Sequence, residues 1–398
     1  MQHLDSRASW TRLAIAAVIG TIGSIGMWSF VVALPAIQAG FGVQRGEASL
    51  PYTLTMVGFA FGGVLMGRLA DRFGIFVPLV AGALALGAGY VTASMAPTLI
   101  TFALAQLVIG FGSSASFAPL MADMSHWFAR RRGIAVALAS VGNYLAGTLW
   151  PPPLQAFIAA HGWRPAHLAI GLICIATLVP LAFLMRRRAP MDAASHAPPV
   201  SRFGALDLSQ NTLLMLLIVA GVGCCVAMSM PQVHIVAYCT DLGYGPARGA
   251  EMLSAMLGFG IISRIAAGFV ADRIGGLNAL IVGSTLQGVA LFLYLFFDSM
   301  ASLYVISALF GLFQGGIVPM YAVIVREYFP ASKAGGIVGL VVMATLFGMA
   351  FGGWVSGVIF DWTGSYRLAF LNGLMWNLLN VAIAAFLLLK RRFTPAAA

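Results

Sequence analysis

One arginine of this chain lies deep inside an apolar run. Arg264 falls within residues 252–270, and no other Lys or Arg is so far from the end of such a run. A charged side chain near the centre of a bilayer costs roughly 3 kcal/mol on insertion scales, so it normally faces a polar cavity. A guanidinium can bind a carboxylate through two parallel charge-assisted hydrogen bonds. Arg264 therefore predicts an anion-binding site, and the alternative is an arginine held only by backbone carbonyls and water.

Further polar residues lie at a similar depth in other apolar runs. Counting about 15 Å from the run ends, at 1.5 Å per helical residue, selects several that could hydrogen-bond a substrate. These candidates are Ser114, Asn143, Tyr144 and Gln314, and Tyr321, which lies nearer the inner side, is a further one. Serine in a membrane helix is more often a packing residue, whereas Asn143 and Tyr144 interrupt an otherwise small and apolar run.

Two titratable residues share one face of another run. His234 and Asp241 are seven residues apart, which is two helical turns. Histidine changes its charge near neutral pH, and a desolvated Asp can titrate in the same range. We therefore regard both as candidates for proton coupling. The alternative is a solvated histidine and an aspartate that ends its helix just before Gly243.

The elements that position these residues are apolar helices. The chain has 398 residues, of which 60% are hydrophobic and only 9% charged, and its mean hydropathy is +0.93. No water-soluble globular domain shows this composition. Runs of about 20 apolar residues, each long enough to cross the hydrocarbon core, predict an all-α integral membrane protein. The twelve predicted spans are 12–34, 51–70, 76–95, 99–122, 133–157, 166–185, 211–239, 248–271, 277–297, 301–325, 335–360 and 367–389.

The basic residues are concentrated in the loops on one side of the predicted spans. Of the 22 Lys and Arg residues, seventeen lie in segments on the side of the N-terminus, and the opposite loops hold only Arg45, Arg164, Arg248 and Arg367. This positive-inside bias places both termini in the cytoplasm and favours the inner, or plasma, membrane. The net charge of +10 thus reflects topology, and we expect the lipid bilayer and not nucleic acid as its partner.

An internal repeat of about 200 residues divides the chain. The segment from Gly67 to Gly74 returns as Gly268 to Gly275, and Trp127 with Phe128 returns as Tyr328 with Phe329. We therefore expect two pseudo-symmetric six-helix bundles, residues 1–186 and 208–398, joined by a cytoplasmic linker at 187–207. Such duplicated proteins place the substrate near the midplane where the halves meet.

The repeated segments resemble the cytoplasmic gating motif of the major facilitator superfamily. The resemblance covers nearly the whole chain and implies the twelve-helix major facilitator fold with transport by alternating access. It assigns gating roles to Gly67, Asp71, Arg72, Gly74, Gly268, Asp272, Arg273 and Gly275. The basic residue usual after the final glycine is replaced by Ile75 and Phe76 in one copy, and by Gly276 and Leu277 in the other, so the gate differs from the family pattern.

Within the superfamily, residues 234–243 and 263–272 resemble the monocarboxylate transporter and oxalate:formate antiporter group. In that group the arginine of the eighth helix binds the substrate carboxylate, and this role carries over to Arg264. Relatives that carry dicarboxylates are expected to have a second basic residue in span eleven, but residues 335–360 contain none. We therefore expect a small monocarboxylate such as lactate or pyruvate, moved with a proton or exchanged for another anion. Gly260 replaces an acidic residue of some relatives and leaves the proton route open.

Other classes of function find less support. A drug or cation exporter of the same fold predicts an acidic residue in the central cavity, where this chain has Arg264. An enzyme would need a catalytic constellation, and the sequence shows no metal-spaced cluster, phosphate loop or Ser-His-Asp set. The four cysteines lie in or beside apolar spans, so a disulfide framework is not expected. We expect no cofactor and a transporter that works as a monomer.

Overall fold

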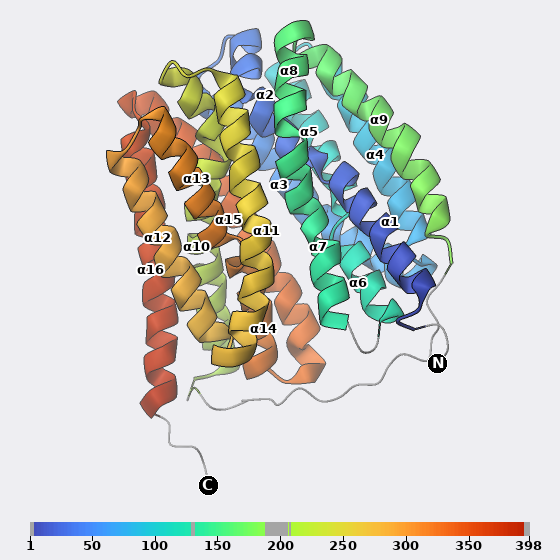
Figure 1. Cartoon of the computed structure of the whole chain (residues 1–398), viewed down its shortest axis with the longest axis vertical. Coiled ribbons are helices and arrows are strands. Elements are labelled where there is room, and N and C mark those ends of the chain that lie inside the picture. Colours follow the sequence, from blue (N-terminus) through green and yellow to red (C-terminus); the bar gives the residue numbers. More distant parts are fainter. Residues whose placement is uncertain (1–3, 129–131, 188–205, 207, 394–398) are drawn as a thin grey trace. The chain divides into compact units, whose positions relative to one another are not determined.

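A computed structural model describes residues 4–128, 132–187, 206 and 208–393, and every regular element in them is an α-helix (Figure 1). The first half contains α1 (Arg7–Gly23), α2 (Ile25–Phe41), α3 (Arg45–Phe73), α4 (Phe76–Ser94), α5 (Leu99–Ser114), α6 (Ala118–Trp127), α7 (Arg132–Leu149), α8 (Pro151–His161) and α9 (Trp163–Leu184). The second half contains α10 (Gln210–Asp241), α11 (Pro246–Ile274), α12 (Gly276–Phe296), α13 (Met300–Gln314), α14 (Ile317–Tyr328), α15 (Ala331–Thr363) and α16 (Tyr366–Phe393).

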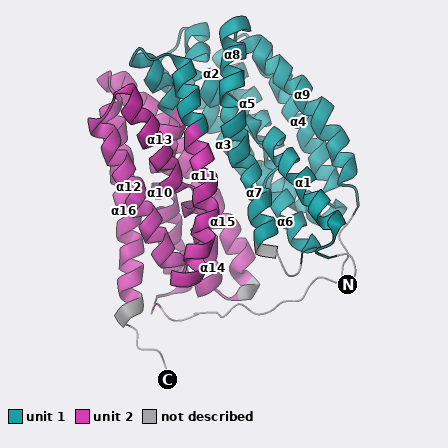
Figure 2. Cartoon of the chain, in the orientation of Figure 1, with its two compact units in different colours: residues 1–195, 234–254 teal, residues 196–233, 255–398 magenta. Residues whose placement is uncertain are grey.

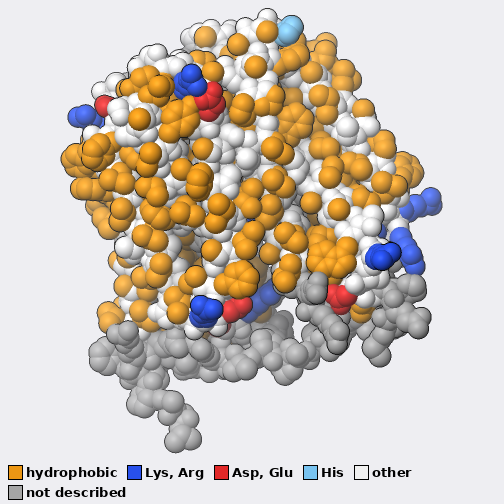
Figure 3. All heavy atoms as spheres, viewed as in Figure 1, with side chains coloured by type: hydrophobic (Ala, Val, Ile, Leu, Met, Phe, Trp, Pro, Cys, Tyr) orange, Lys and Arg blue, Asp and Glu red, His pale blue; other side chains and the backbone are white. Residues whose placement is uncertain are grey.

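The twelve predicted spans are confirmed in the described residues. Twelve helical stretches are long and apolar enough to cross a membrane, and each overlaps one predicted span. Large apolar side chains such as Phe61, Phe183 and Phe269 are exposed, and apolar side chains cover much of the visible surface between charged groups near its two ends (Figure 3). Such a surface suits contact with lipid.

Four of the spans are built from two helices each. The breaks lie at Ser24, at residues 115–117, at Trp150 and at residues 315–316. Pro151 explains one of them, because a proline lacks the backbone N–H of a helix interior and restricts the residue before it. The apolar pattern alone did not predict these breaks, since an interrupted span is as apolar as a continuous one.

The chain divides into two compact units (Figure 2). Unit 1 comprises Met1–Ser195 and His234–Ser254, and unit 2 comprises His196–Val233 and Ala255–Ala398. The end of α10 and the start of α11 form a hairpin, residues 234–254, that belongs to unit 1 although it follows the linker in sequence. The predicted linker 187–207 lies, apart from residues 187 and 206, outside the described residues.

The duplication is visible in helix packing. A Cβ atom at Gly110 of α5 would overlap the carbonyl oxygen of Thr55 in α3. The same contact recurs 201 residues later, where a Cβ at Gly311 of α13 would overlap the carbonyl oxygen of Met256 in α11. Only glycine permits this backbone approach. Each unit thus packs its second and fourth spans through a glycine at an equivalent position.

Candidate substrate site and ion pairs

Arg264 lies in the C-terminal half of α11. It precedes the last residue of this helix, Ile274, by ten residues, or about 15 Å at 1.5 Å per residue. The side chain is half-buried. This depth agrees with a position near the middle of a span that crosses about 30 Å of hydrocarbon.

The turn that carries Arg264 packs on the break between α13 and α14. The backbone N–H of Gly316 donates to Oγ of the buried Ser263 over 3.1 Å, and Gly316 is the residue just before α14. The beginning of a helix carries a partial positive charge from its backbone N–H groups. Transporters often hold anionic groups at discontinuous helices of this kind. The guanidinium of Arg264 and the start of α14 are each features that favour an anion.

Gln314, the last residue of α13, is fully buried. Neither its Oε1 nor its Nε2 atom has a hydrogen-bond partner in the structure. Buried polar groups are nearly always satisfied by protein, water or a ligand, so such an amide calls for a partner. Because Gln314 adjoins the break at residues 315–316, it is a candidate for binding a polar atom of a ligand.

Tyr321 belongs to a buried hydrogen-bond chain in unit 2. Its hydroxyl donates to Oδ1 of Asn380 over 2.8 Å, and Nδ2 of Asn380 donates to Oγ of Ser284 over 2.8 Å. The chain links α14, α16 and α12 through side chains that are all buried. Asn380 and Ser284 were missed by the sequence reasoning, although a polar Asn in an apolar span was a signal that could have found Asn380.

Asn143 belongs to α7 and contacts α2 within unit 1. Trp28 Nε1 donates to its backbone oxygen (3.1 Å) and to its Oδ1 (3.0 Å), and its own Nδ2 contacts Met27 Sδ at 3.2 Å. Tyr144 is buried beside it. Ser114 Oγ donates to the Phe111 carbonyl, 2.7 Å away, as a serine bonded within its own helix commonly does.

The predicted site residues thus fall in two groups. The structure places Arg264, Gln314 and Tyr321 in unit 2, and Ser114, Asn143 and Tyr144 in unit 1. Their roles toward a substrate stay predictions.

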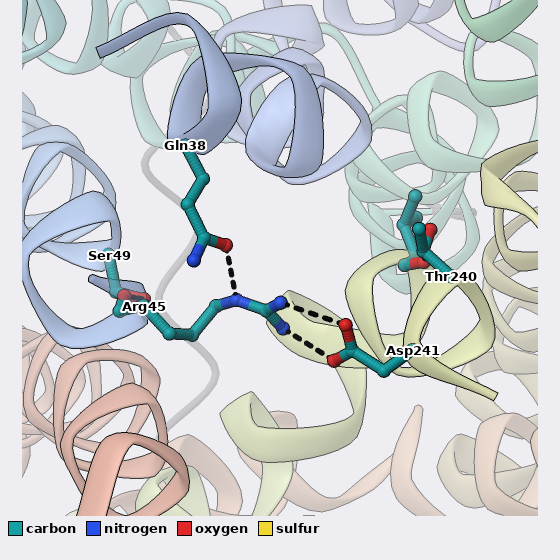
Figure 4. Close-up of polar contacts among 6 residues, drawn as sticks. Gln38, Arg45, Ser49, Thr240 and Asp241 are labelled. Carbon is teal, nitrogen blue, oxygen red and sulfur yellow. Dashed lines mark hydrogen bonds and ion pairs between the residues drawn. The ribbon is translucent and has the colours of Figure 1, made fainter. Parts of the chain in front are cut away.

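The two predicted proton-coupling residues lie in the 234–254 hairpin. His234 is fully buried. Asp241 accepts two hydrogen bonds from Arg45, at 3.0 Å from Nη1 and 3.1 Å from Nη2 (Figure 4). Arg45 also donates from Nε to Gln38 Oε1 over 2.5 Å. The sequence reasoning counted Arg45 only as a loop charge and missed this pair.

A second ion pair lies at the other end of unit 1. Arg12 of α1 donates to Oδ2 of Asp123 in α6 over 2.9 Å and to the Met185 carbonyl over 3.0 Å. Its guanidinium carbon lies 4.5 Å from the centre of the Trp127 ring, which adds a cation–π contact. Because these groups join α1, α6 and the end of α9, we assign them to the stability of the unit. The sequence reasoning missed this pair also.

The repeated loop motif forms matching turns. Gly74 and Gly275 have φ angles of 82° and 85°, values that favour glycine, where α3 and α11 end. Asp71, Arg72, Asp272 and Arg273 are exposed. A gating role for them stays a prediction.

Within the part of the chain that the structure describes, no group of three or more His, Cys, Asp or Glu residues could hold a metal ion. Its four cysteines are free and buried.

Twelve apolar spans, duplicated helix packing and an arginine within a span define a membrane transporter. The sequence profile of the Major Facilitator Superfamily matches residues 16–302 and, in an overlapping match, residues 252–398. The chain belongs to this superfamily. Proteins of this superfamily and fold are transporters and not enzymes, so the class of protein predicted from the sequence is confirmed.

The similar proteins include monocarboxylate transporters and an efflux protein. The chain is 28% identical over 369 residues to monocarboxylate transporter 13 of Bos taurus, covering 89% of this chain and 82% of the relative. It is 28% identical over 390 residues to monocarboxylate transporter 11 of Homo sapiens, covering 92% and 80%. An agnestins efflux protein of Paecilomyces divaricatus is 25% identical over 336 residues, covering 82% and 74%.

Solved structures agree on the fold. A mutant of the nucleoside transporter NupG superposes with a TM-score of 0.74 at 13% identity, covering 95% of this chain and 99% of that one. A bacterial homologue of the human lysosomal transporter Spinster gives 0.73 at 14% identity, covering 98% of both chains. At these identities the likeness shows the fold alone.

Proposed function

We propose that this protein is a secondary transporter of small monocarboxylate anions, such as lactate or pyruvate, that works by alternating access. The observation that carries the proposal is Arg264, a half-buried guanidinium within α11 whose turn packs on the α13–α14 break. A carboxylate can accept two charge-assisted hydrogen bonds from one guanidinium. The names of the monocarboxylate transporters among the relatives support this substrate class.

One cation favours one carboxylate. Residues 335–360, the greater part of α15, contain no Lys or Arg. A dicarboxylate such as oxalate would leave its second charge without a cationic partner, and a desolvated charge without a partner is costly. We assign the buried amide of Gln314 to a hydroxyl or keto oxygen of the substrate. Asn143, Tyr144, Ser114 and Tyr321 are further candidate contacts.

A substrate panel tests the proposal. In proteoliposomes loaded with an unlabelled acid, counterflow of labelled lactate or pyruvate should exceed that of oxalate at least about tenfold, which corresponds to about 1.4 kcal/mol of discrimination. Protein-free liposomes measure the background. Equal counterflow of oxalate would point to an oxalate/formate type of exchanger, and counterflow of none of these acids would refute the proposal.

An exporter of larger organic molecules is the second candidate. It is favoured by the efflux protein among the fungal relatives. The same panel, extended to a cationic drug and a neutral aromatic metabolite, separates the two classes. Because a guanidinium repels cations, we expect no transport of the cationic drug.

We further propose proton symport with the carboxylate, across a plasma membrane with both termini on the cytoplasmic side, as the loop charges predict. Accumulation of lactate should then rise with an inward proton gradient, by up to about tenfold per pH unit for one proton per anion. A protonophore should abolish this rise. Accumulation that is insensitive to the gradient would favour exchange.

The variants His234→Gln and Asp241→Asn test the two candidate proton carriers. The variant that removes the true proton carrier should still catalyse counterflow, but its lactate accumulation should no longer rise with the proton gradient.

A further inference from the structure

The ion pair between Arg45 and Asp241 joins segments that are far apart in sequence. Arg45 is the first residue of α3, and Asp241 is the last residue of α10. The side chain of Arg45 is 6% exposed and that of Asp241 is 31% exposed. The two hydrogen bonds are parallel, and Gln38 of α2 accepts a third hydrogen bond from Nε of the same guanidinium (Figure 4). This geometry is stronger and more specific than that of a surface pair.

Neither charge suits its own helix. A cation at a helix N-terminus and an anion at a helix C-terminus both interact unfavourably with the backbone dipole. Arg45 is at an N-terminus and Asp241 at a C-terminus. The two residues therefore do not serve their own helices, and their favourable interaction is with one another.

The pair is not part of the duplicated fold. With the repeat offset of 201 residues seen in the glycine contacts, the counterpart of Arg45 is Pro246 and the counterpart of Asp241 is Gly40. Neither counterpart is charged, so no second copy of the pair can form. The Arg45–Asp241 contact is therefore made once in the duplicated fold.

The hairpin that carries Asp241 is attached to unit 1 at a second point. Ser254 Oγ donates to the Thr148 carbonyl of α7. Both helices of the hairpin continue into unit 2, with the change between Val233 and His234 in α10 and between Ser254 and Ala255 in α11. Pro231 lies inside α10 two residues before this change. A proline within a helix removes one backbone hydrogen bond and is a common place for bending.

We propose that Arg45 and Asp241 form a latch that holds the 234–254 hairpin on α2 and α3, and that the latch opens and closes in each transport cycle. The hairpin would move about Pro231 when the ion pair separates. The inference rests on the proposed function only in that the protein transports by alternating access. It gives Asp241 a structural partner in one state of the cycle, which the sequence alone did not suggest.

Cross-linking tests whether the pair must separate. In the double variant Arg45→Cys/Asp241→Cys, a short bis-maleimide should join the two positions and reduce lactate counterflow at least about tenfold relative to the untreated double variant, since a tied hairpin cannot leave α3. Each single cysteine variant, treated with the same reagent, controls for modification and for the native cysteines. Failure to cross-link, or unchanged counterflow by the cross-linked protein, would overturn the latch. A pair with a purely structural role would tolerate the cross-link.

Hydrogen exchange provides a second measurement that needs no substrate. In Asp241→Asn, amides of residues 234–254 should exchange about five- to thirtyfold faster, the range expected when one or two kcal/mol of local stability is lost. The charge exchange Arg45→Asp/Asp241→Arg should restore protection. Arg248→Gln is the matched control, because it removes the exposed Arg248–Glu251 pair of the same hairpin.

Equal exchange in Asp241→Asn and Arg248→Gln would overturn the latch even if lactate is transported. Conversely, faster exchange in Asp241→Asn but not in Arg248→Gln would support the latch. This result would hold even if the wild-type protein transported no carboxylate, an outcome that would refute the proposed substrate and not the latch.

Discussion

Replacing Arg264 with alanine is expected to reduce carboxylate transport at least about a hundredfold. Removing one partner of a buried, hydrogen-bonded charge pair typically costs 2–5 kcal/mol, and each 1.4 kcal/mol is tenfold. Arg264→Lys keeps the charge but not the two parallel donors, so we expect it to retain more activity, with a loss of about tenfold. Initial rates in proteoliposomes, normalised to the amount of reconstituted protein, measure both effects.

The control for Arg264 is another arginine of the same helix. Arg248 lies in the first turn of α11, and its pair with Glu251 is 51% and 40% exposed. Arg248→Ala should therefore change transport and stability little, as substitutions in exposed pairs usually do. Wild-type rates in both Arg264 variants would show that this guanidinium does not bind the carboxylate. Equal losses in Arg264→Ala and Arg248→Ala would indicate a general effect on the helix.

The spans and the position of Arg264 could be predicted because the bilayer imposes a local rule. Crossing hydrocarbon requires about 20 apolar residues in a row, and a charge that violates the rule stands out. The turn glycines Gly74 and Gly275 were also visible, since their motif is repeated. These features depend on residues close together in sequence.

The contacts that sequence reasoning missed depend on residues far apart. Arg45 and Asp241 are separated by 196 positions, and Arg12 and Asp123 by 111. No local pattern selects one partner among several charges at the same end of the helices. One signal was available for the first pair, because a cation at a helix start and an anion at a helix end are both locally unfavourable and imply partners elsewhere. No comparable signal pointed to the helix break beside Gln314, because glycines such as Gly315 and Gly316 are common within membrane spans.

Glycine-to-alanine substitutions on paired helices should have opposite effects on stability. In Gly311→Ala the new Cβ would overlap the Met256 carbonyl, a backbone atom that cannot rotate away. Forcing extra atoms into a packed interface costs about 1–3 kcal/mol, so α11 and α13 should separate and the protein should unfold at a lower temperature. Gly110→Ala should behave alike against Thr55.

Gly268→Ala on α11 is the matched control, since a Cβ there meets nothing within 4 Å. Replacing a helical glycine by alanine without a clash stabilises by about 0.4–1 kcal/mol, so this variant should melt at an equal or higher temperature. Thermal unfolding of the purified variants in one detergent compares them. Equal shifts at Gly311 and Gly268 would contradict the packing argument. Gly268 also belongs to the predicted gating motif, so a variant that is stable but transports slowly would place the role of this glycine in the movement of α11 and not in its folding.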